Sequence, residues 1–351
     1  LYLLNLSYLM NKNKPAIILD PYPRTMDILF SDINLKFLKN NFTLLTAPKK
    51  NKKNFYIKNL PHAHFIIGQP NLPTELLKTQ TKLKAIFNVE SNFMDNMDYD
   101  YCFKNNIHVL ATSPVFAQPV AEMALGLTLS IARSIHIAHN DFINGKEKYG
   151  GEISQNNFLI KNKKIGLLGF GDLAKSLVPL LHPFTNDIVA YDPWVPDMEI
   201  KKNNVNPVSL KKLLSSSEII YVLATITSSN QGMINHNALK NIKDNTTFVL
   251  MSRAAIIDFD DFYKFLKNRK VFAAIDVFPV EPVPKNHKIR KLNNVIFSPH
   301  RAGALDSAFK EMGDIVLEDL KLINKGLPPR LCKKAIKETV RHLRSKPVDI
   351  N

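Results

Sequence analysis

Three polar side chains each follow an apolar run of the kind that forms a buried strand. Arg253 comes after TTFVLMS, Glu281 comes shortly after AIDVF, and His300 comes after NVIFSP. Because ligands of open α/β sheets bind beyond the carboxyl ends of the strands, we expect these three side chains to meet at one crevice.

Each of these residue types suits one task in the interconversion of a small 2-oxo acid and its 2-hydroxy acid. His300 would exchange a proton with the substrate oxygen, and the carboxylate of Glu281 would stabilise the imidazolium and fix the ring. The guanidinium of Arg253 would hold the substrate carboxylate as a bidentate fork and polarise the carbonyl. Taken singly, each residue has a structural explanation, but their joint placement predicts hydride transfer at the alpha carbon of the acid.

A glycine-rich turn predicts a site for a dinucleotide cofactor. The run KKIGLLGF leads into a GxGxxG/A pattern, whose residues are Gly169, Phe170, Gly171, Asp172, Leu173 and Ala174. The first glycine permits a tight turn, the second lets the backbone approach a pyrophosphate, and the small sixth residue lets the helix pack on the sheet. The N–H groups of Asp172 and Leu173 would face the anion at the positive end of that helix.

Asp192 ends the next strand, IVAYD, about 20 residues beyond the glycine turn. Its carboxylate would accept hydrogen bonds from both ribose hydroxyls and repel a 2′-phosphate, and no arginine follows it in YDPW. We therefore expect NAD rather than NADP as the cofactor. The alternative is that Asp192 serves only as a turn residue at the end of a strand.

The order of apolar runs predicts an α/β fold with two doubly wound parallel-sheet units, Rossmann-like or flavodoxin-like, and an active-site cleft between them. The first series contains AIILD, a helix over residues 26–39, FTLLTA, HFIIG, LKAIFNV and IHVLA. The second series contains KKIGLLGF, DIVAYD, EIIYVLA, TTFVLM, VFAAIDVF and NVIFSPH, with helical segments between the strands.

Two long helical patterns lie outside these series. The run SPVFAQPVAEMALGLTLSIARSIHIAHNDF predicts a long apolar helix that starts near Gln118, packs in a core and can also carry a subunit interface. The run LDSAFKEMGDIVLEDLKLINKG predicts a helix that ends at Gly326, before Pro328 and Pro329.

Composition favours a soluble globular chain with two domains. The 351 residues exceed one usual core, and 45% apolar content is enough to fill two. The net charge of +16 comes from scattered lysines without a basic arm or zinc-finger spacing, so we expect no nucleic-acid partner. Cys102 and Cys332 form no CxxC pair, so we expect no disulfide framework, no thiolate metal site and a cytoplasmic location.

The apolar start LYLLNLSYLM has no basic region before it and no small-residue cleavage site, and it is too short to span a bilayer. Met10 directly precedes NKNKPAIILD, so we expect residues 1–9 to be an upstream extension of the true start. We also expect no later run to be long and apolar enough for a membrane span, and hence no membrane partner.

Four segments resemble the D-isomer-specific 2-hydroxyacid dehydrogenase family, which includes D-3-phosphoglycerate dehydrogenases and glyoxylate/hydroxypyruvate reductases. They are LMSRAAIID around Arg253, AAIDVFPVEP with Asp276 and Glu281, SPHRAG with His300, and PVAE at 119–122. The resemblance covers nearly the whole chain. It implies that Arg253, Glu281 and His300 are the catalytic set and that Asp276 contacts the nicotinamide carboxamide.

The resemblance also implies a discontinuous substrate domain, residues 1–112 with 304–351, and an NAD-binding domain at 113–303. The substrate would meet backbone N–H groups near Val89, Glu90 and Ser91, and the long helix after Gln118 would form a homodimer interface. No metal is implied. Beyond the glycine turn and Asp192, the implied cofactor-binding residues are Thr225, Met251, Ser252, Arg253, Asp276 and His300.

The chain departs from the family pattern at several positions. Leu250 stands where asparagine is frequent, and Ala254 stands where a glycine usually follows the arginine, which affects the expected shape of that loop. The run TITSSN at 225–230 lacks the usual proline and second threonine, and Asp172 replaces a common arginine beside the pyrophosphate, so we expect weaker NAD affinity than is typical. The run FNVESNFMDNMDYD, with Glu90, replaces the glycine-rich substrate loop.

Two other classes of protein compete with a dehydrogenase. An NAD-sensing regulatory or co-repressor-like protein on the same scaffold would bind the cofactor and a partner without turnover. The presence of Arg253, Glu281 and His300 together favours the enzyme. A Rossmann-type methyltransferase is a further alternative, in which an acidic strand end followed by this set of residues has no evident use.

Overall fold

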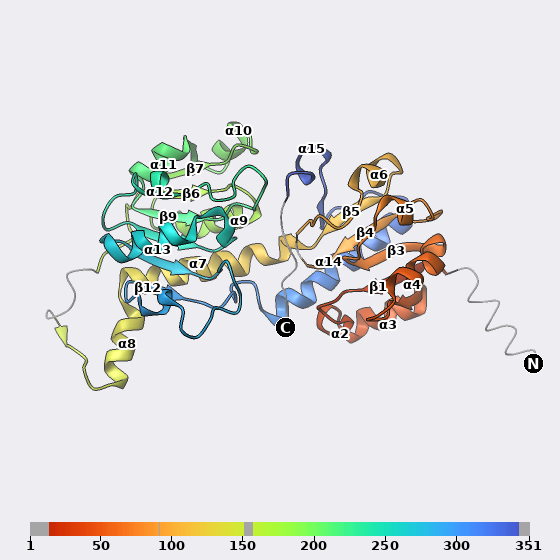
Figure 1. Ribbon diagram of the computed structural model, residues 1–351, viewed down its shortest axis with the longest axis horizontal. Coiled ribbons are helices and arrows are strands. Elements are labelled where there is room, and N and C mark those ends of the chain that lie inside the picture. The colour runs from red at the N-terminus through yellow and green to blue at the C-terminus, as the bar shows by residue number, and fades with distance from the viewer. Residues whose placement is uncertain (1–13, 91, 151–156, 344–351) are drawn as a thin grey trace, which may run out of the picture. The chain divides into compact units, whose positions relative to one another are not determined.

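The computed structural model describes residues 14–90, 92–150 and 157–343, and the chain forms two compact units (Figure 1). Unit 1 comprises the chain up to Val115 and again from Leu305 onward, and unit 2 is Phe116–Ala304. Unit 2 is thus inserted between the two parts of unit 1.

The sheet of unit 1 has the strand order β13-β5-β4-β3-β1-β2. All neighbours are parallel except β13, which pairs antiparallel with β5. Without β13, the order is the 2-1-3-4-5 arrangement of flavodoxin-like folds. The strands are β1 (Ala16–Asp20), β2 (Thr43–Thr46), β3 (Ala63–Gly68), β4 (Ala85–Asn88), β5 (His108–Ala111) and β13 (Lys333–Lys334).

Two helices of unit 1 begin at polar residues whose side chains cap them. The Ser31 hydroxyl accepts from the N–H of Asn34 at the start of α3. The Asp98 carboxylate accepts from the N–H of Tyr101 at the start of α6. The helices are α2 (Met26–Leu29), α3 (Asp32–Asn41), α4 (Lys52–Asn59), η2 (Leu60–His62), α5 (Thr74–Leu77), α6 (Tyr99–Lys104), α14 (Asp306–Asn324) and α15 (Lys337–Val340).

The sheet of unit 2 has the order β12-β11-β10-β9-β6-β7-β8, and every neighbouring pair is parallel. Counted along unit 2, this is the 3-2-1-4-5-6 order of a Rossmann sheet with one strand added. The order reverses between β6 and β9, which makes that point the topological switch. The strands are β6 (Ile165–Leu168), β7 (Ile188–Tyr191), β8 (Asn206–Pro207), β9 (Ile219–Val222), β10 (Thr247–Leu250), β11 (Phe272–Ile275) and β12 (Val295–Phe297).

Helices cover this sheet and bury its continuous apolar runs, as a parallel sheet requires. The helix α7 packs against α9 and contacts β10 and β11. The helices of unit 2 and of the junction before it are η3 (Ser113–Phe116), α7 (Ala117–Ala132), α8 (Ile135–Ile143), α9 (Asp172–Leu181), α10 (Asp197–Lys201), α11 (Leu210–Ser216), α12 (His236–Leu239), η5 (Ala254–Ile256), α13 (Phe259–Asn268) and η6 (Lys288–Lys291). The two parallel-sheet units confirm the predicted fold class.

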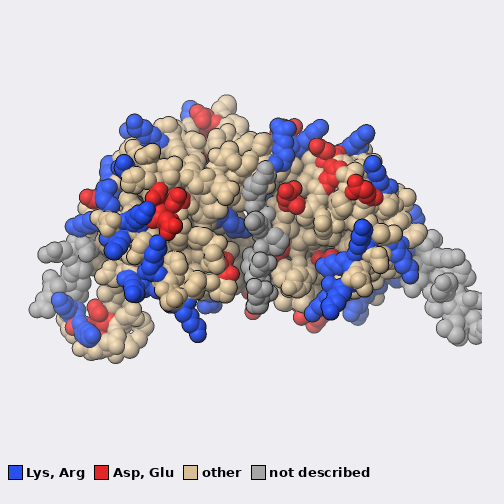
Figure 2. Space-filling model, viewed as in Figure 1, with Lys and Arg blue, Asp and Glu red and all other residues tan. Residues whose placement is uncertain are grey.

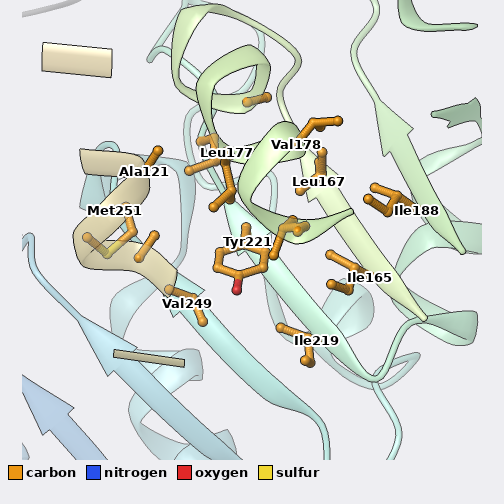
Figure 3. Packing of buried hydrophobic residues seen from close by; sticks show 14 of the residues in the cluster. Ala121, Ile165, Leu167, Leu177, Val178, Ile188, Ile219, Tyr221, Val249 and Met251 are labelled. Carbon is orange, nitrogen blue, oxygen red and sulfur yellow. The ribbon is translucent and has the colours of Figure 1, made fainter. Parts of the chain in front are cut away.

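Tyr221 lies inside the core between the sheet and α7 (Figure 3). Its ring is fully buried among apolar side chains, and its hydroxyl is 2.8 Å from the hydroxyl of Thr128 on α7. Thr128 in turn donates to the carbonyl of Ala124. The buried polar pair therefore fixes α7 on β9 without leaving an unsatisfied hydroxyl.

Each of two predicted long helices is divided into two shorter helices in the structure. The helix expected over residues 26–39 ends at Leu29, and a new helix starts after the cap residue Ser31. The long helix expected from Gln118 onward ends at Ala132, because Ser134 adopts the left-handed conformation with φ of 51° and starts α8 in a new direction. Apolar periodicity does not register such a break.

The expectation that no later run is long and apolar enough for a membrane span was wrong. By length and composition, Ser113–Ala132 passes that test. In the structure 44% of its apolar window is buried, and α7 forms part of the core of unit 2. A core helix of this kind is weak evidence for a membrane span.

On the face drawn in Figure 2, lysine and arginine side chains are scattered among acidic ones.

We expect Gly313→Ala to destabilise unit 1. A β-carbon at Gly313 on α14 would lie 2.2 Å from the carbonyl oxygen of Leu29 on α2, and backbone cannot yield cheaply. Overpacking of this kind costs about 1–3 kcal/mol. In the matched control Gly126→Ala on α7, the added carbon meets nothing within 4 Å, so helix propensity should stabilise by about 0.5–1 kcal/mol. Calorimetric melting of both variants tests this, and equal melting temperatures would contradict it.

Candidate active site

The glycine turn lies at the topological switch of unit 2. Gly169 has φ of 96°, and a β-carbon there would lie 2.5 Å from the backbone of Ala224, which follows β9. Only glycine therefore lets the loops after β6 and β9 approach this closely. At Gly171 an added β-carbon would meet nothing within 4 Å. The space in front of the first turn of α9 is thus open to a group such as a pyrophosphate, as the pattern predicts.

Asp192 is brought to the same turn. Its Oδ2 accepts from the N–H of Phe170 at 2.8 Å, and its Oδ1 accepts from the N–H of Trp194 at 2.8 Å. A carboxylate has about four acceptor positions, so both oxygens retain capacity for ribose hydroxyls. The fold therefore joins the acidic strand end to the glycine turn, and the residues fit a dinucleotide.

The loop after β9 is held by the side chain of Asn230, which no sequence pattern indicates. Asn230 accepts from the N–H of Thr227 at 2.7 Å and donates to the carbonyl of Thr225 at 2.8 Å. These bonds fix the TITSSN loop although it lacks the usual proline. Thr225 itself is exposed, next to the Ala224 backbone that approaches Gly169.

Arg253, Glu281 and His300 follow β10, β11 and β12 and come together in unit 2. The Oε2 atom of Glu281 lies 2.7 Å from Nδ1 of His300, and Oε1 accepts from the N–H of Phe278 at 2.8 Å. The imidazole and the carboxylate are each about a third exposed, at 31% and 29%. Arg253 donates from Nη1 to the carbonyl of Ser252 at 2.7 Å, and its charge acts on Glu281.

The pKa of Glu281 lies below its ordinary value. Partial burial raises this pKa, but the hydrogen bonds from His300 and from the Phe278 N–H, with the charges of His300 and Arg253, outweigh that effect. Glu281 is therefore ionised at neutral pH, and its pairing with His300 is lost only as the pH falls through the lowered pKa. An ionised acceptor on Nδ1 leaves Nε2 as the ring nitrogen for a substrate.

Asp276 holds the loop that carries His300. Its buried carboxylate accepts from the Ser298 hydroxyl at 2.5 Å and from the N–H groups of Arg301 and Ala302 at 2.9 and 3.2 Å. Its carbonyl accepts from the N–H of His300 at 2.8 Å. His300 has a φ of 53°, which is uncommon for a residue other than glycine. The bonds to Asp276 over-determine that conformation, a function the sequence pattern did not reveal.

Met251 and Ser252, predicted to bind the cofactor, are both buried directly after β10. The side chain of Met251 belongs to the core cluster around Tyr221, so any contact with a cofactor would come from its backbone (Figure 3). The Ser252 hydroxyl oxygen is buried without a hydrogen-bond partner among the described residues. Such an atom beside Arg253 leaves an acceptor and donor for a ligand.

The predicted substrate-binding residues of unit 1 follow β4, and Ser91 lies outside the described residues. The carbonyl of Val89 accepts from Arg24 Nε at 3.0 Å, and the same Nε lies 3.5 Å from Glu90 Oε1. The N–H of Glu90 donates to the Asn88 side chain at 2.9 Å, so the structure does not leave it for a substrate as expected. Arg24 was missed because it stands in a different segment of the sequence.

Comparisons with known proteins identify the family of the chain. A model of the NAD-binding domain of D-isomer specific 2-hydroxyacid dehydrogenases matches residues 125–302. A glyoxylate reductase of Thermofilum pendens is 30% identical over 271 residues, which cover 76% of this chain and 79% of the relative. A hydroxypyruvate reductase of Thermotoga maritima is 28% identical over 290 residues, which cover 81% and 92%. The solved structure of a phosphoglycerate oxidoreductase from Rhizobium etli is 42% identical, with a TM-score of 0.83 over 93% of this chain and 100% of the other.

The sheet order of unit 2 and these matches define an NAD-dependent oxidoreductase. The chain belongs to the D-isomer specific 2-hydroxyacid dehydrogenase family, as the four sequence segments predicted. The prediction of NAD as cofactor is confirmed by the same family match.

We expect Asp276→Asn to lower turnover more than cofactor affinity. The two oxygens of Asp276 accept from the N–H groups of Arg301 and Ala302, but an amide has only one oxygen. Its NH₂ would therefore face one of these N–H donors, and the His300 loop should shift. Such a shift lowers kcat roughly tenfold to a hundredfold. NADH affinity is read from energy transfer from the single tryptophan, Trp194, which is 46% exposed beside Asp192.

Ser298→Ala serves as the control, because it removes one donor to the Asp276 carboxylate and leaves the two backbone donors in place. Its effect on kcat should be smaller. Intact kcat with strongly weakened NADH binding in Asp276→Asn would instead favour the direct nicotinamide contact implied by the family resemblance.

Proposed function

We propose that this protein interconverts a small 2-oxo acid and its D-2-hydroxy acid with Arg253, Glu281 and His300 as the catalytic set. The observation that carries the proposal is the 2.7 Å contact between Glu281 Oε2 and His300 Nδ1 within reach of the charge of Arg253. The relatives named as glyoxylate and hydroxypyruvate reductases and as a phosphoglycerate oxidoreductase act in this chemical class.

In the proposed mechanism His300 moves the proton and Glu281 keeps it in place. When bound, NADH would supply the hydride that adds to the alpha carbon. His300 Nε2 donates its proton to the carbonyl oxygen during reduction, and it accepts the hydroxyl proton in the reverse direction. Glu281, ionised and bonded to Nδ1, stabilises the imidazolium and holds the ring plane.

Arg253 binds the substrate carboxylate in this mechanism. Its guanidinium keeps one donor on the Ser252 carbonyl, which fixes the side chain close to the backbone of the β10 end. A guanidinium is the planar fork that a carboxylate accepts, and its positive charge would polarise the adjacent carbonyl. In unit 1, Val89 would also take part in substrate binding, with Arg24 as a positioning residue through its bond to Val89.

NAD would be held by the glycine turn and the strand ends around it. The open space at Gly171 and the first turn of α9 would take the pyrophosphate, and Asp192 the ribose hydroxyls. Thr225, Met251, Ser252 and Asp276 would line the rest of the cofactor site, together with Arg253 and His300.

A homodimer through unit 2 belongs to the same proposal, with α8 rather than α7 as its main surface. None of the nine residues of α8 is buried, and the exposed fractions are 54% for Ile135, 65% for Phe142 and 67% for Ile143. Apolar side chains gathered on one exposed helix favour a protein partner. A cytoplasmic location fits the buried free thiols of Cys102 and Cys332.

We expect His300→Ala to lower kcat by roughly a hundredfold or more, because proton transfer by a positioned side chain contributes that much. NADH binding should persist, as followed by energy transfer from Trp194. NADH absorbance with glyoxylate, hydroxypyruvate, pyruvate and 3-phosphohydroxypyruvate measures turnover. The control His62→Ala changes an exposed histidine of unit 1 and should leave kcat unchanged.

Full activity of the His300 variant would remove the assignment. Wild-type protein that binds NADH but turns over none of these acids would favour the alternative, an NAD-sensing regulatory protein.

We expect Asp192→Ala to relax the choice between NAD and NADP. Removing the carboxylate takes away an acceptor for the ribose hydroxyls and the repulsion of a 2′-phosphate. The ratio of kcat/KM for NADH over NADPH should fall by about tenfold, the equivalent of about 1.4 kcal/mol. Asp197→Ala, on the exposed start of α10, is the matched loss of one charge. A wild-type ratio in the Asp192 variant would contradict the ribose role.

A further inference from the structure

Unit 1 has an open pocket at the amino ends of two neighbouring strands. Its volume is about 510 Å³. Lys84, which directly precedes β4, and His108, the first residue of β5, line one side, and the N–H of His108 donates to the Lys84 carbonyl at 2.9 Å. Hydrogen bonding within the sheet therefore fixes the spacing of the two backbones.

The other side of the pocket is the end of α14, which is capped by its own backbone. The N–H of Leu327 donates to the Leu322 carbonyl at 2.9 Å, and that of Gly326 donates to the Ile323 carbonyl at 3.0 Å. With Gly326 at φ of 78°, this is a Schellman motif, so the last carbonyls of the helix are satisfied. The wall it presents to the pocket is formed by apolar side chains, including Ile323 and Leu327.

The charge on the pocket wall is positive. Lys84 and His108 are the ionisable residues among the described residues that line it, and no carboxylate does. Lys334 on β13 adds its charge at His108. The negative charge of Asp319 also acts on His108 and raises its pKa. The buried Asp319 carboxylate already accepts from backbone N–H groups after α14, among them those of Arg330 and Cys332.

His108 lies in surroundings that disfavour its charged form. Burial and then the charge of Lys334 lower the pKa of His108, while Asp319 raises it, and the net direction is downward. An anion bound between His108 and Lys84 would offset the unfavourable charge.

We propose that this pocket binds a small organic anion, with its carboxylate on Lys84 and His108 and a short apolar group against Leu327 and Ile323. A volume of this size accommodates a small metabolite, and an apolar wall with a few convergent polar groups is typical of such sites. The side-chain amides of Asn105 and Asn106 on the rim add further polar groups.

This pocket is separate from the proposed substrate site. Lys84 precedes the amino end of β4, whereas Val89 and Glu90 follow its carboxyl end. Arg253 belongs to the other unit. A ligand in the pocket is therefore an additional ligand, and its binding does not depend on turnover.

Titration calorimetry of the full chain with benzoate and with benzamide tests the proposal. The two probes have nearly the same shape, but only benzoate is charged. We expect benzoate to bind, and benzamide to bind at least about tenfold more weakly, because charge-assisted hydrogen bonds are lost. Lys84→Ala with His108→Asn should weaken benzoate binding by a similar factor. Both side chains are partly exposed, and melting curves check that the variant is folded.

Two single variants locate the bound probe. Lys82→Ala removes the same charge two residues away from Lys84 and should bind benzoate like wild type, since Lys82 does not line the pocket. Arg253→Ala removes the proposed carboxylate clamp of unit 2 and should also bind benzoate. Loss of binding in Arg253→Ala, unchanged binding in the Lys84 and His108 variant, equal binding of benzamide, or no binding of benzoate would each overturn the proposal.

Discussion

Parallel pairing of the strands is the constraint on which the rest of unit 2 depends. Neighbours that run in the same direction end at the same edge of the sheet, so the residues after β6, β7, β10, β11 and β12 all lie along one edge, whatever their distance in the sequence. The cost is that loops from opposite sides of the switch must pass very close to each other. Gly169 allows this close approach, since any side chain there would overlap the backbone of Ala224.

Most of the strands could be predicted, because each strand of a sheet covered on both faces appears in the sequence as a short continuous apolar run. The exceptions are informative. The edge strands β8 and β13 have two residues each and are polar, so pairing alone defines them. The break at Ser134 lies within an apolar periodic stretch, and a left-handed residue leaves no trace in periodicity.

The candidate site was predictable to the extent that it stands at strand ends. Glu281 and His300 are 19 residues apart in sequence, and their contact follows from the adjacency of β11 and β12. The supporting bonds were not predictable. Asn230 and Asp276 act through backbone groups, which have no side-chain identity to read, and Arg24 reaches Val89 from 65 residues away. Residue types therefore indicated the chemistry, and the fold supplied the groups that hold it in place.

The insertion of unit 2 into unit 1 has a consequence for how the protein is made. The strands β1 to β5 leave the ribosome first, but α14, whose Gly313 fits against Leu29, is synthesised after all of unit 2. Until then the early sheet lacks a helix that covers part of its apolar surface, which exposes it to chaperones and to aggregation. Unit 2 is contiguous in the chain and can complete its own core before unit 1 does.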